Sequence, residues 1–143
     1  MLPAVTMSTA VHEWLVHACL APGSREFVAL LAGPTAAGPG VVTACEPLPN
    51  ASTRADAFEV EPHTFARAES RLRAAGLAFR GFAHGHGDGS AHPSLADRHA
   101  LWRDCVQVIG ARNELGPVLR AFWLPAGGDA CEPLPWTVVA EAP

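Results

Sequence analysis

Residues 83–97 read Ala83-His84-Gly85-His86-Gly87-Asp88-Gly89-Ser90-Ala91-His92-Pro93-Ser94-Leu95-Ala96-Asp97, and the architecture can be built outward from them. The apolar run Leu77–His86 predicts a buried strand that ends at this stretch. Because side chains alternate between the two faces of a strand, His84 and His86 should present both imidazoles on one face. A glycine-rich turn follows, and Ser94–Trp102 is predicted to form a helix.

Turns and capping residues divide the rest of the chain. Ser8 or Thr9 begins a helix with apolar residues at Val11, Trp14, Leu15 and Ala18, which ends before Pro22-Gly23. A second helix over His63–Ala75 follows Pro62 and ends at Gly76. Apolar runs bounded by Gly and Pro predict the remaining strands, which are Arg25–Ala32, Gly40–Leu48, Cys105–Ile109, Val118–Leu124 and Trp136–Ala140, with an extended segment at Phe58–Val60.

These elements predict one α/β domain over residues 1–143, with a mixed β-sheet of about six strands flanked by about three helices. A chain of 143 residues with 49% hydrophobic content has a sizeable core and no room for a second domain. The strands come in pairs and runs instead of alternating strictly with helices. A doubly wound Rossmann arrangement is therefore disfavoured.

Charge and composition exclude several classes of function. Ten Lys+Arg against fourteen Asp+Glu give a net charge of −4, which offers no basic field for nucleic acid. All ten basic residues are arginine, so mechanisms that need a lysine amine are excluded. The first 23 residues contain neither a basic residue nor a continuous apolar run, so we expect no signal peptide, no membrane span and a cytoplasmic protein.

The cysteines and the remaining histidines carry weaker signals. Cys19, Cys45, Cys105 and Cys131 are widely scattered, which predicts buried free thiols instead of a disulfide framework or a zinc ribbon. Four histidines are expected on the surface or near helix ends, namely His12, His17, His63 and His99. His92, inside the glycine-rich turn, is a further candidate for substrate contact or for adventitious metal binding.

The spacing around His84 and His86 is typical of a metal site. Two imidazoles and the carboxylate of Asp97 would leave one tetrahedral position for water, as in a catalytic zinc site. Taken alone, Ser94-Leu95-Ala96-Asp97 is also an ordinary helix-capping pattern, and a His-x-His pair can simply form surface hydrogen bonds. Their combination across a glycine-rich turn favours the metal site, and capping would hold Asp97 still.

The same residues resemble the motif of the JAMM metallopeptidases, also called the MPN+ or JAB1/MPN/Mov34 family. That motif is an upstream Glu, then H-x-H, seven residues, S, two residues and D. His84-Gly85-His86, Gly87–Pro93, Ser94 and Asp97 fill it, and the upstream Glu corresponds to Glu26. Asn50, followed by Phe58 and Pro62, also looks like the middle section of the family. Gly85 departs from the usual Ser or Thr, and Gly87 from the commoner Pro.

The resemblance implies a minimal bacterial form with a JAB1/MPN-like sheet and cytidine-deaminase-like layering. It implies one Zn²⁺ per chain held by His84, His86 and Asp97, with Glu26 as the general base and Ser94 as the oxyanion donor. The implied substrates are ubiquitin-like or sulfur-carrier β-grasp proteins, cut after a C-terminal Gly-Gly. The alternatives are a non-catalytic MPN-type scaffold subunit and a cell-wall or phage-type peptide hydrolase.

Overall fold

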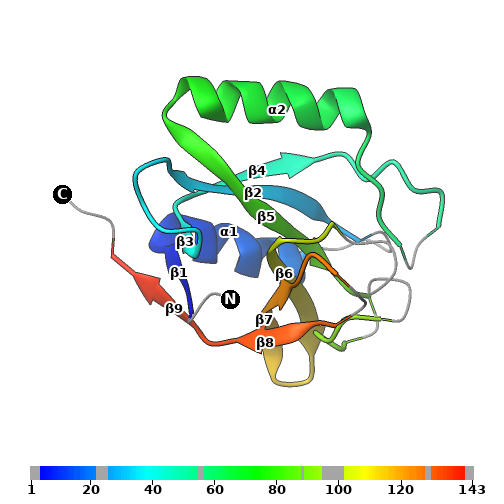
Figure 1. Cartoon of the computed structure of the whole chain (residues 1–143). Coiled ribbons are helices and arrows are strands. Elements are labelled where there is room, and N and C mark those ends of the chain that lie inside the picture. The colour runs from blue at the N-terminus through cyan, green and yellow to red at the C-terminus, as the bar shows by residue number, and fades with distance from the viewer. Residues whose placement is uncertain are drawn as a thin grey trace.

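The computed structural model describes residues 4–21, 26–54, 57–87, 89–94, 102–127 and 130–140. Within these ranges the chain forms two helices and nine strands in two sheets (Figure 1). In chain order the elements are β1 (Val5–Ser8), α1 (Thr9–Leu20), β2 (Val28–Pro34), β3 (Val41–Val42), β4 (Ala44–Leu48), α2 (Pro62–Ala74), β5 (Leu77–Gly85), β6 (Cys105–Asn113), β7 (Gly116–Leu124), β8 (Glu132–Leu134) and β9 (Trp136–Val139).

The larger sheet has six strands in the order β4-β2-β5-β6-β7-β8. β5 runs parallel to β6, and the other neighbours in this sheet are antiparallel. The predicted mixed sheet of about six strands is therefore confirmed. β5 lies between β2 and β6, and the end of β5 at Gly81–Gly85 is buried. The strand that carries His84 is thus held on both sides by hydrogen-bonded neighbours.

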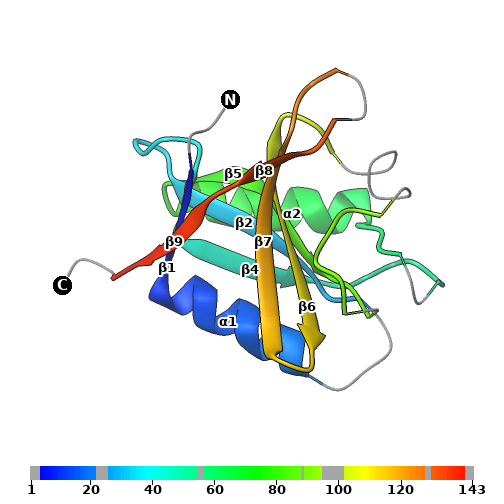
Figure 2. The same cartoon turned by 90° about the horizontal axis from the view of Figure 1, so that it is seen from below.

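The two helices cover opposite faces of this sheet, as Figures 1 and 2 show from two directions. Ala29 and Leu31 of β2 pack in one core cluster with α1, whereas Val28 and Leu30 pack in another with α2. Because both faces of β2 are buried, its sequence is apolar throughout instead of alternating. Neither helix is long and apolar enough to cross a membrane, and no other helix lies within the described ranges.

Helix α1 begins at a predicted capping residue, and α2 begins one residue before its predicted start, after Glu61, a cap that was not predicted. The Ser8 hydroxyl accepts a hydrogen bond of 3.3 Å from the Val11 N–H, so Ser8 caps α1. Helix α2 begins at Pro62, one residue before the predicted start, and the Glu61 carboxylate accepts from the His63 and Thr64 N–H groups at 3.0 and 2.8 Å. Those hydrogen bonds lower the pKa of Glu61.

The first two predicted strands have different bounds in the structure. The strand expected at Arg25–Ala32 begins at Val28 and continues through Pro34, because Gly33-Pro34 still pairs with β5. The strand expected at Gly40–Leu48 is divided into two short strands that belong to different sheets. The segment Phe58–Val60 has no regular secondary structure. Tertiary pairing, instead of the local turn residues, sets these bounds.

Other differences concern the second half of the chain. The predicted strands Cys105–Ile109 and Val118–Leu124 extend toward each other as β6 and β7, which form one antiparallel hairpin. Trp136–Ala140 is confirmed as β9, which ends one residue earlier. For the predicted helix Ser94–Trp102, the two end residues are described and are not helical, whereas residues 95–101 lie outside the described ranges.

Strands β1 and β8 were not predicted. β1 forms the centre of the smaller sheet, β3-β1-β9, and pairs in parallel with both neighbours. β8 pairs with β7 at the edge of the larger sheet. Both strands are short, and their partners are distant in sequence or lie across a loop. Too few residues are present for a hydrophobic period to be visible.

The four cysteines are free, as predicted. Cys105 is buried, whereas Cys19, Cys45 and Cys131 are partly exposed. Burial raises the pKa of the Cys19 and Cys105 thiols to about 11 and that of Cys45 to about 12. These three thiols are therefore protonated at neutral pH, which makes them poor nucleophiles.

Candidate metal centre

Three side chains from two neighbouring strands of the larger sheet converge at one point. Glu26, which lies two residues before the start of β2, is beside His84 of β5 and His86 just after it. One ligand atom from each of the three residues lies within 4.8 Å of the other two. Among the described residues this is the group of His, Cys, Asp and Glu side chains that could hold a metal ion. We call it the cluster.

The two histidines have the relative geometry that their spacing predicts. Their Nε2 atoms are 3.1 Å apart, so both imidazoles present the same nitrogen to the same point. His84 is fully buried, and its ring lies 4.5 Å from the ring of Phe58. In the sheet His84 pairs with Val28 on β2 and with Ile109 on β6. A ligand in the middle of a six-stranded sheet is held rigidly.

A second contact fixes which nitrogen of His86 is available to a metal. The Nδ1 atom lies 2.8 Å from the Ser90 carbonyl oxygen, in the glycine-rich turn. A carbonyl oxygen can only accept, so Nδ1 carries the proton and Nε2 keeps its lone pair. This pattern, in which the other ring nitrogen donates to a backbone carbonyl, is the usual support of a metal-bound histidine.

The position of Glu26 is set by the backbone pairing of the residue next to it, Phe27. Glu26 as a whole residue is 7% exposed. The Gly85 N–H donates to the Phe27 carbonyl at 3.0 Å, which extends the pairing of β2 with β5. Because Phe27 lies opposite Gly85, the antiparallel register places Glu26 opposite His86. The predicted association of Glu26 with the two histidines is therefore present in the structure.

The side chain of Asn50 also holds the backbone at Glu26. Its Nδ2 atom donates to the carbonyl oxygens of Glu26 and Ala57, each at 3.0 Å. Its Oδ1 atom accepts from the N–H groups of Ser52 and Glu59 at 3.0 and 3.1 Å. The Asn50 side-chain amide thus connects the loop after β4 to the backbone of Glu26. The sequence signalled Asn50 only through the family resemblance.

We expect Asn50→Ala to lower the free energy of unfolding by about 2–3 kcal/mol, because it removes four hydrogen bonds worth about 1 kcal/mol each, some of them partly exposed. Urea unfolding followed by circular dichroism measures the loss. Asn113→Ala is the matched control, because Asn113 accepts one hydrogen bond in an exposed turn. Its loss should stay below about 1 kcal/mol. Equal losses in the two variants would contradict the bracing role of Asn50.

The remaining predicted site residues are placed only in part. Ser94, the predicted oxyanion donor, is described and exposed. Asp97, the predicted third metal ligand, lies outside the described residues, and so does His99. His92 lines a separate pocket with Arg120 and Phe122, and no residue of the cluster lines that pocket.

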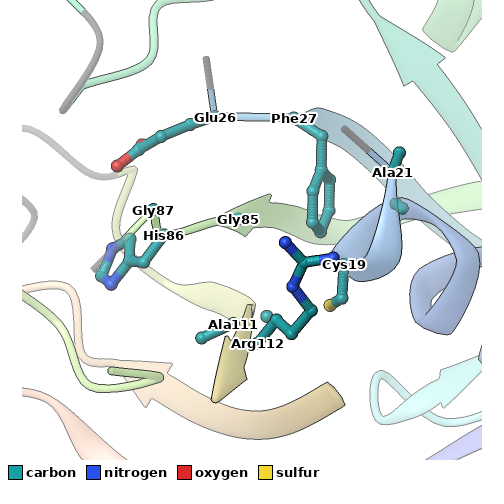
Figure 3. A pocket seen from close by; sticks show the side chains of 11 residues that line it. Cys19, Ala21, Glu26, Phe27, Gly85, His86, Gly87, Ala111 and Arg112 are labelled. Carbon is teal, nitrogen blue, oxygen red and sulfur yellow. The ribbon is translucent and has the colours of Figure 1, made fainter. Parts of the chain in front are cut away.

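A pocket of about 140 Å³ opens beside the cluster (Figure 3). The Glu26 carboxylate and the His86 ring lie at one end of it, and Phe27, Cys19 and Arg112 lie at the other. Arg112 also donates from Nη1 to the Leu20 carbonyl at 3.3 Å, at the end of α1. The backbone of three glycines lines the pocket as well, at positions 85, 87 and 110.

The sequence profile of the prokaryotic homologs of the JAB domain matches residues 8–125. The chain belongs to this family. The match includes Glu26, both histidines of the cluster and Ser94. The JAMM motif found in the sequence therefore lies within a JAB domain that covers most of the chain. No curated protein sequence matches the chain significantly.

Solved structures confirm the JAB fold. A protein from Desulfitobacterium hafniense is 23% identical, with a TM-score of 0.80 over 96% of this chain and 94% of its own. A protein from Salinibacter ruber is 22% identical, with a TM-score of 0.65 and coverages of 97% and 93%. A JAB1/MPN domain protein from Archaeoglobus fulgidus is 19% identical, with a TM-score of 0.57 and coverages of 97% and 100%.

The donor set of this JAB domain suits zinc. Two imidazoles with Nε2 atoms 3.1 Å apart are ligands that Zn²⁺ prefers, and the Glu26 carboxylate lies beside them. The fixed proton on His86 Nδ1 and the rigid position of His84 in β5 favour binding without a large rearrangement. The cluster can therefore hold a metal ion, as expected for a JAMM metallohydrolase.

Proposed function

We propose that this JAB domain is a zinc-dependent peptidase or isopeptidase. Its substrate would be a ubiquitin-like or sulfur-carrier β-grasp protein, cut after a C-terminal Gly-Gly. The observation that carries the proposal is the convergence of Glu26 with the Nε2 atoms of His84 and His86 beside a glycine-lined pocket. Membership in the JAB family supports the same reaction.

His84 and His86 would hold one Zn²⁺ through Nε2, and the motif assigns the third ligand to Asp97. When bound, zinc supplies Lewis acidity, which polarises a carbonyl and brings the pKa of a water near 7. His84 contributes a rigid position, because it is buried in a central strand. His86 contributes a fixed tautomer, because Ser90 accepts its Nδ1 proton.

Glu26 would act as the general base. Its carboxylate lies within 4.8 Å of ligand atoms on both histidines, which suits proton transfer beside the metal instead of a remote role. It would take the proton from the attacking water and deliver it to the leaving amine. Ser94 is proposed to donate to the oxyanion, the role that the motif gives it.

The pocket favours a tail of small residues. The pocket is small, with a volume of about 140 Å³, and Gly87 contributes backbone without a side chain to its lining beside His86. An extended Gly-Gly segment has no side chains of its own, so its backbone can approach such a surface closely. A bulkier residue beside the scissile bond would not reach the cluster.

A mass-spectrometric cleavage panel tests the proposal. Tail-extended sulfur-carrier and ubiquitin-like proteins are incubated with the zinc-loaded protein, and the released fragment locates the cut. We expect cleavage after Gly-Gly and loss of cleavage when the last Gly is replaced by a bulkier residue. Unstructured casein serves as the comparison substrate. Equal cleavage of casein, with no preference for the Gly-Gly tail, would contradict the substrate assignment.

A further inference from the structure

The first observation is a pair of glycines, one at the end of β5 and one within β6. Gly85 and Gly110 are register partners across the parallel pair, so two positions without side chains lie side by side. Strand residues alternate between faces, so Gly85 faces the side of the sheet opposite to His84 and His86. That side is the one covered by α1, since Ala83, which lies two residues earlier and therefore on the same face, packs in the core cluster with α1.

The ring of Phe27 occupies the space that the two glycines leave. A Cβ atom built on Gly85 would lie 2.4 Å from Phe27 Cδ1 and 2.5 Å from Cε1. A Cβ atom on Gly110 would lie 3.2 Å from Phe27 Cζ and 2.5 Å from Cys19 Sγ. The ring therefore lies directly on the backbone of β5 and β6. We call Gly85 and Gly110 the ring seat.

Helix α1 also contacts the Phe27 ring. Trp14 contacts Phe27 edge to face, with ring centroids 5.8 Å apart at 81°. Pairs with this geometry are attractive beyond the apolar area that they bury. Phe27 thus packs between the sheet and α1 as a partly buried side chain, and its backbone carbonyl accepts from the Gly85 N–H at 3.0 Å. Side chain and backbone of Phe27 are both fixed to the same partner strand.

The fixed position of Phe27 also sets the direction of the neighbouring Glu26 side chain. Glu26 and Phe27 are adjacent in an extended segment, so their side chains point to opposite faces. Because the Phe27 ring is held on the α1 face, the Glu26 side chain must point to the face of His84 and His86. We propose that Phe27 in its ring seat is the positioning residue that aims the Glu26 carboxylate at the metal. This inference rests on the role proposed above for Glu26 as general base.

The ring seat also explains the departure of this chain from the family motif. Where the family usually has Ser or Thr, the side chain would overlap the Phe27 ring, and the ring would have to move by about 1 Å to regain normal contact. Gly85 is therefore required by Phe27, not by the metal. A shift of about 1 Å at a catalytic group can reduce the rate roughly 100-fold.

A double-mutant cycle tests the inference. Gly85→Ser, the residue usual in the family, is expected to lower kcat roughly 10- to 100-fold with KM within about twofold and zinc affinity retained. Phe27→Ala should lower kcat to a similar extent. In the Phe27→Ala background, Gly85→Ser should have no further effect, because no ring remains to be displaced. Equal effects of Gly85→Ser in both backgrounds would overturn the inference.

The stability of the metal-free protein gives a second readout of the same cycle. Gly85→Ser should lower the melting temperature of the chain with Phe27 and leave that of the Phe27→Ala chain unchanged. Gly38→Ser is the matched control, because a Cβ atom on Gly38 would meet nothing within 4 Å. It should change neither kcat nor the melting temperature.

A third comparison separates positioning of the base from general damage to the site. In a Glu26→Gln background, Phe27→Ala should leave the residual rate unchanged within about twofold, because no base remains to be positioned. A further loss there would overturn the positioning role. If the wild-type protein cleaves no Gly-Gly substrate, the proposed function falls together with the role of Phe27. If it does, a negative cycle overturns the inference alone.

Discussion

The double variant His84→Ala, His86→Ala is expected to lose its zinc, from about one ion per chain to less than about one tenth. The two Nε2 atoms that converge at 3.1 Å are then absent, and a carboxylate alone holds Zn²⁺ weakly. Elemental analysis of the purified protein measures the content. Activity toward any Gly-Gly substrate should disappear with the metal.

Two controls make this result specific. His92→Ala changes a histidine of the same region that is outside the cluster, and it should keep full zinc. The single variant His86→Ala avoids a cavity in the core, because His86 is only partly buried whereas His84 is fully buried. A double variant that stays folded and keeps stoichiometric zinc would show that the ligands lie elsewhere.

Glu26→Gln is expected to keep the zinc and lower kcat by roughly two to four orders of magnitude. The substitution preserves size and hydrogen bonding at a residue that is only 7% exposed, but an amide cannot accept the proton. Zinc content, melting temperature and turnover of the same preparation measure the three effects. Loss of zinc in this variant would make Glu26 a metal ligand instead of the base.

Asp97→Ala provides the contrast. If Asp97 is the third ligand, its removal should lower zinc affinity and activity together. A base and a ligand therefore fail differently, and the pair of variants distinguishes the two roles. Wild-type turnover by Glu26→Gln would mean that another group takes the proton.

Local sequence was sufficient for the parts of this protein that depend on neighbouring residues. Ser8 at the start of α1 and Pro62 at the start of α2 act through hydrogen bonds and backbone angles within one turn. The relation of His84 to His86 follows from the two-residue period of a strand, and the structure confirms it. The family motif linked Glu26 to this pair, although nothing local to Glu26 distinguishes it from an ordinary surface carboxylate.

Strand bounds were predicted less well, because pairing and not propensity sets them. Gly33-Pro34 reads as a strand end, yet both residues pair with β5. Gly40–Leu48 reads as one strand, yet its two halves join different sheets. β1 is recognisable only through its partners β3 and β9, which come from residues 41–42 and 136–139.

The two described helices, the mixed sheet, the family and the face shared by His84 and His86 could be predicted from the amino-acid pattern, because they depend on spacing along the chain. The contact of Phe27 with the ring seat of Gly85 and Gly110 and the hydrogen bond from Asn50 to Glu26 became visible in the folded chain alone. Those contacts depend on the register between strands and loops that are 24 or more residues apart. Register is fixed by burial of both faces of β2 and β5 at once, which no local pattern expresses.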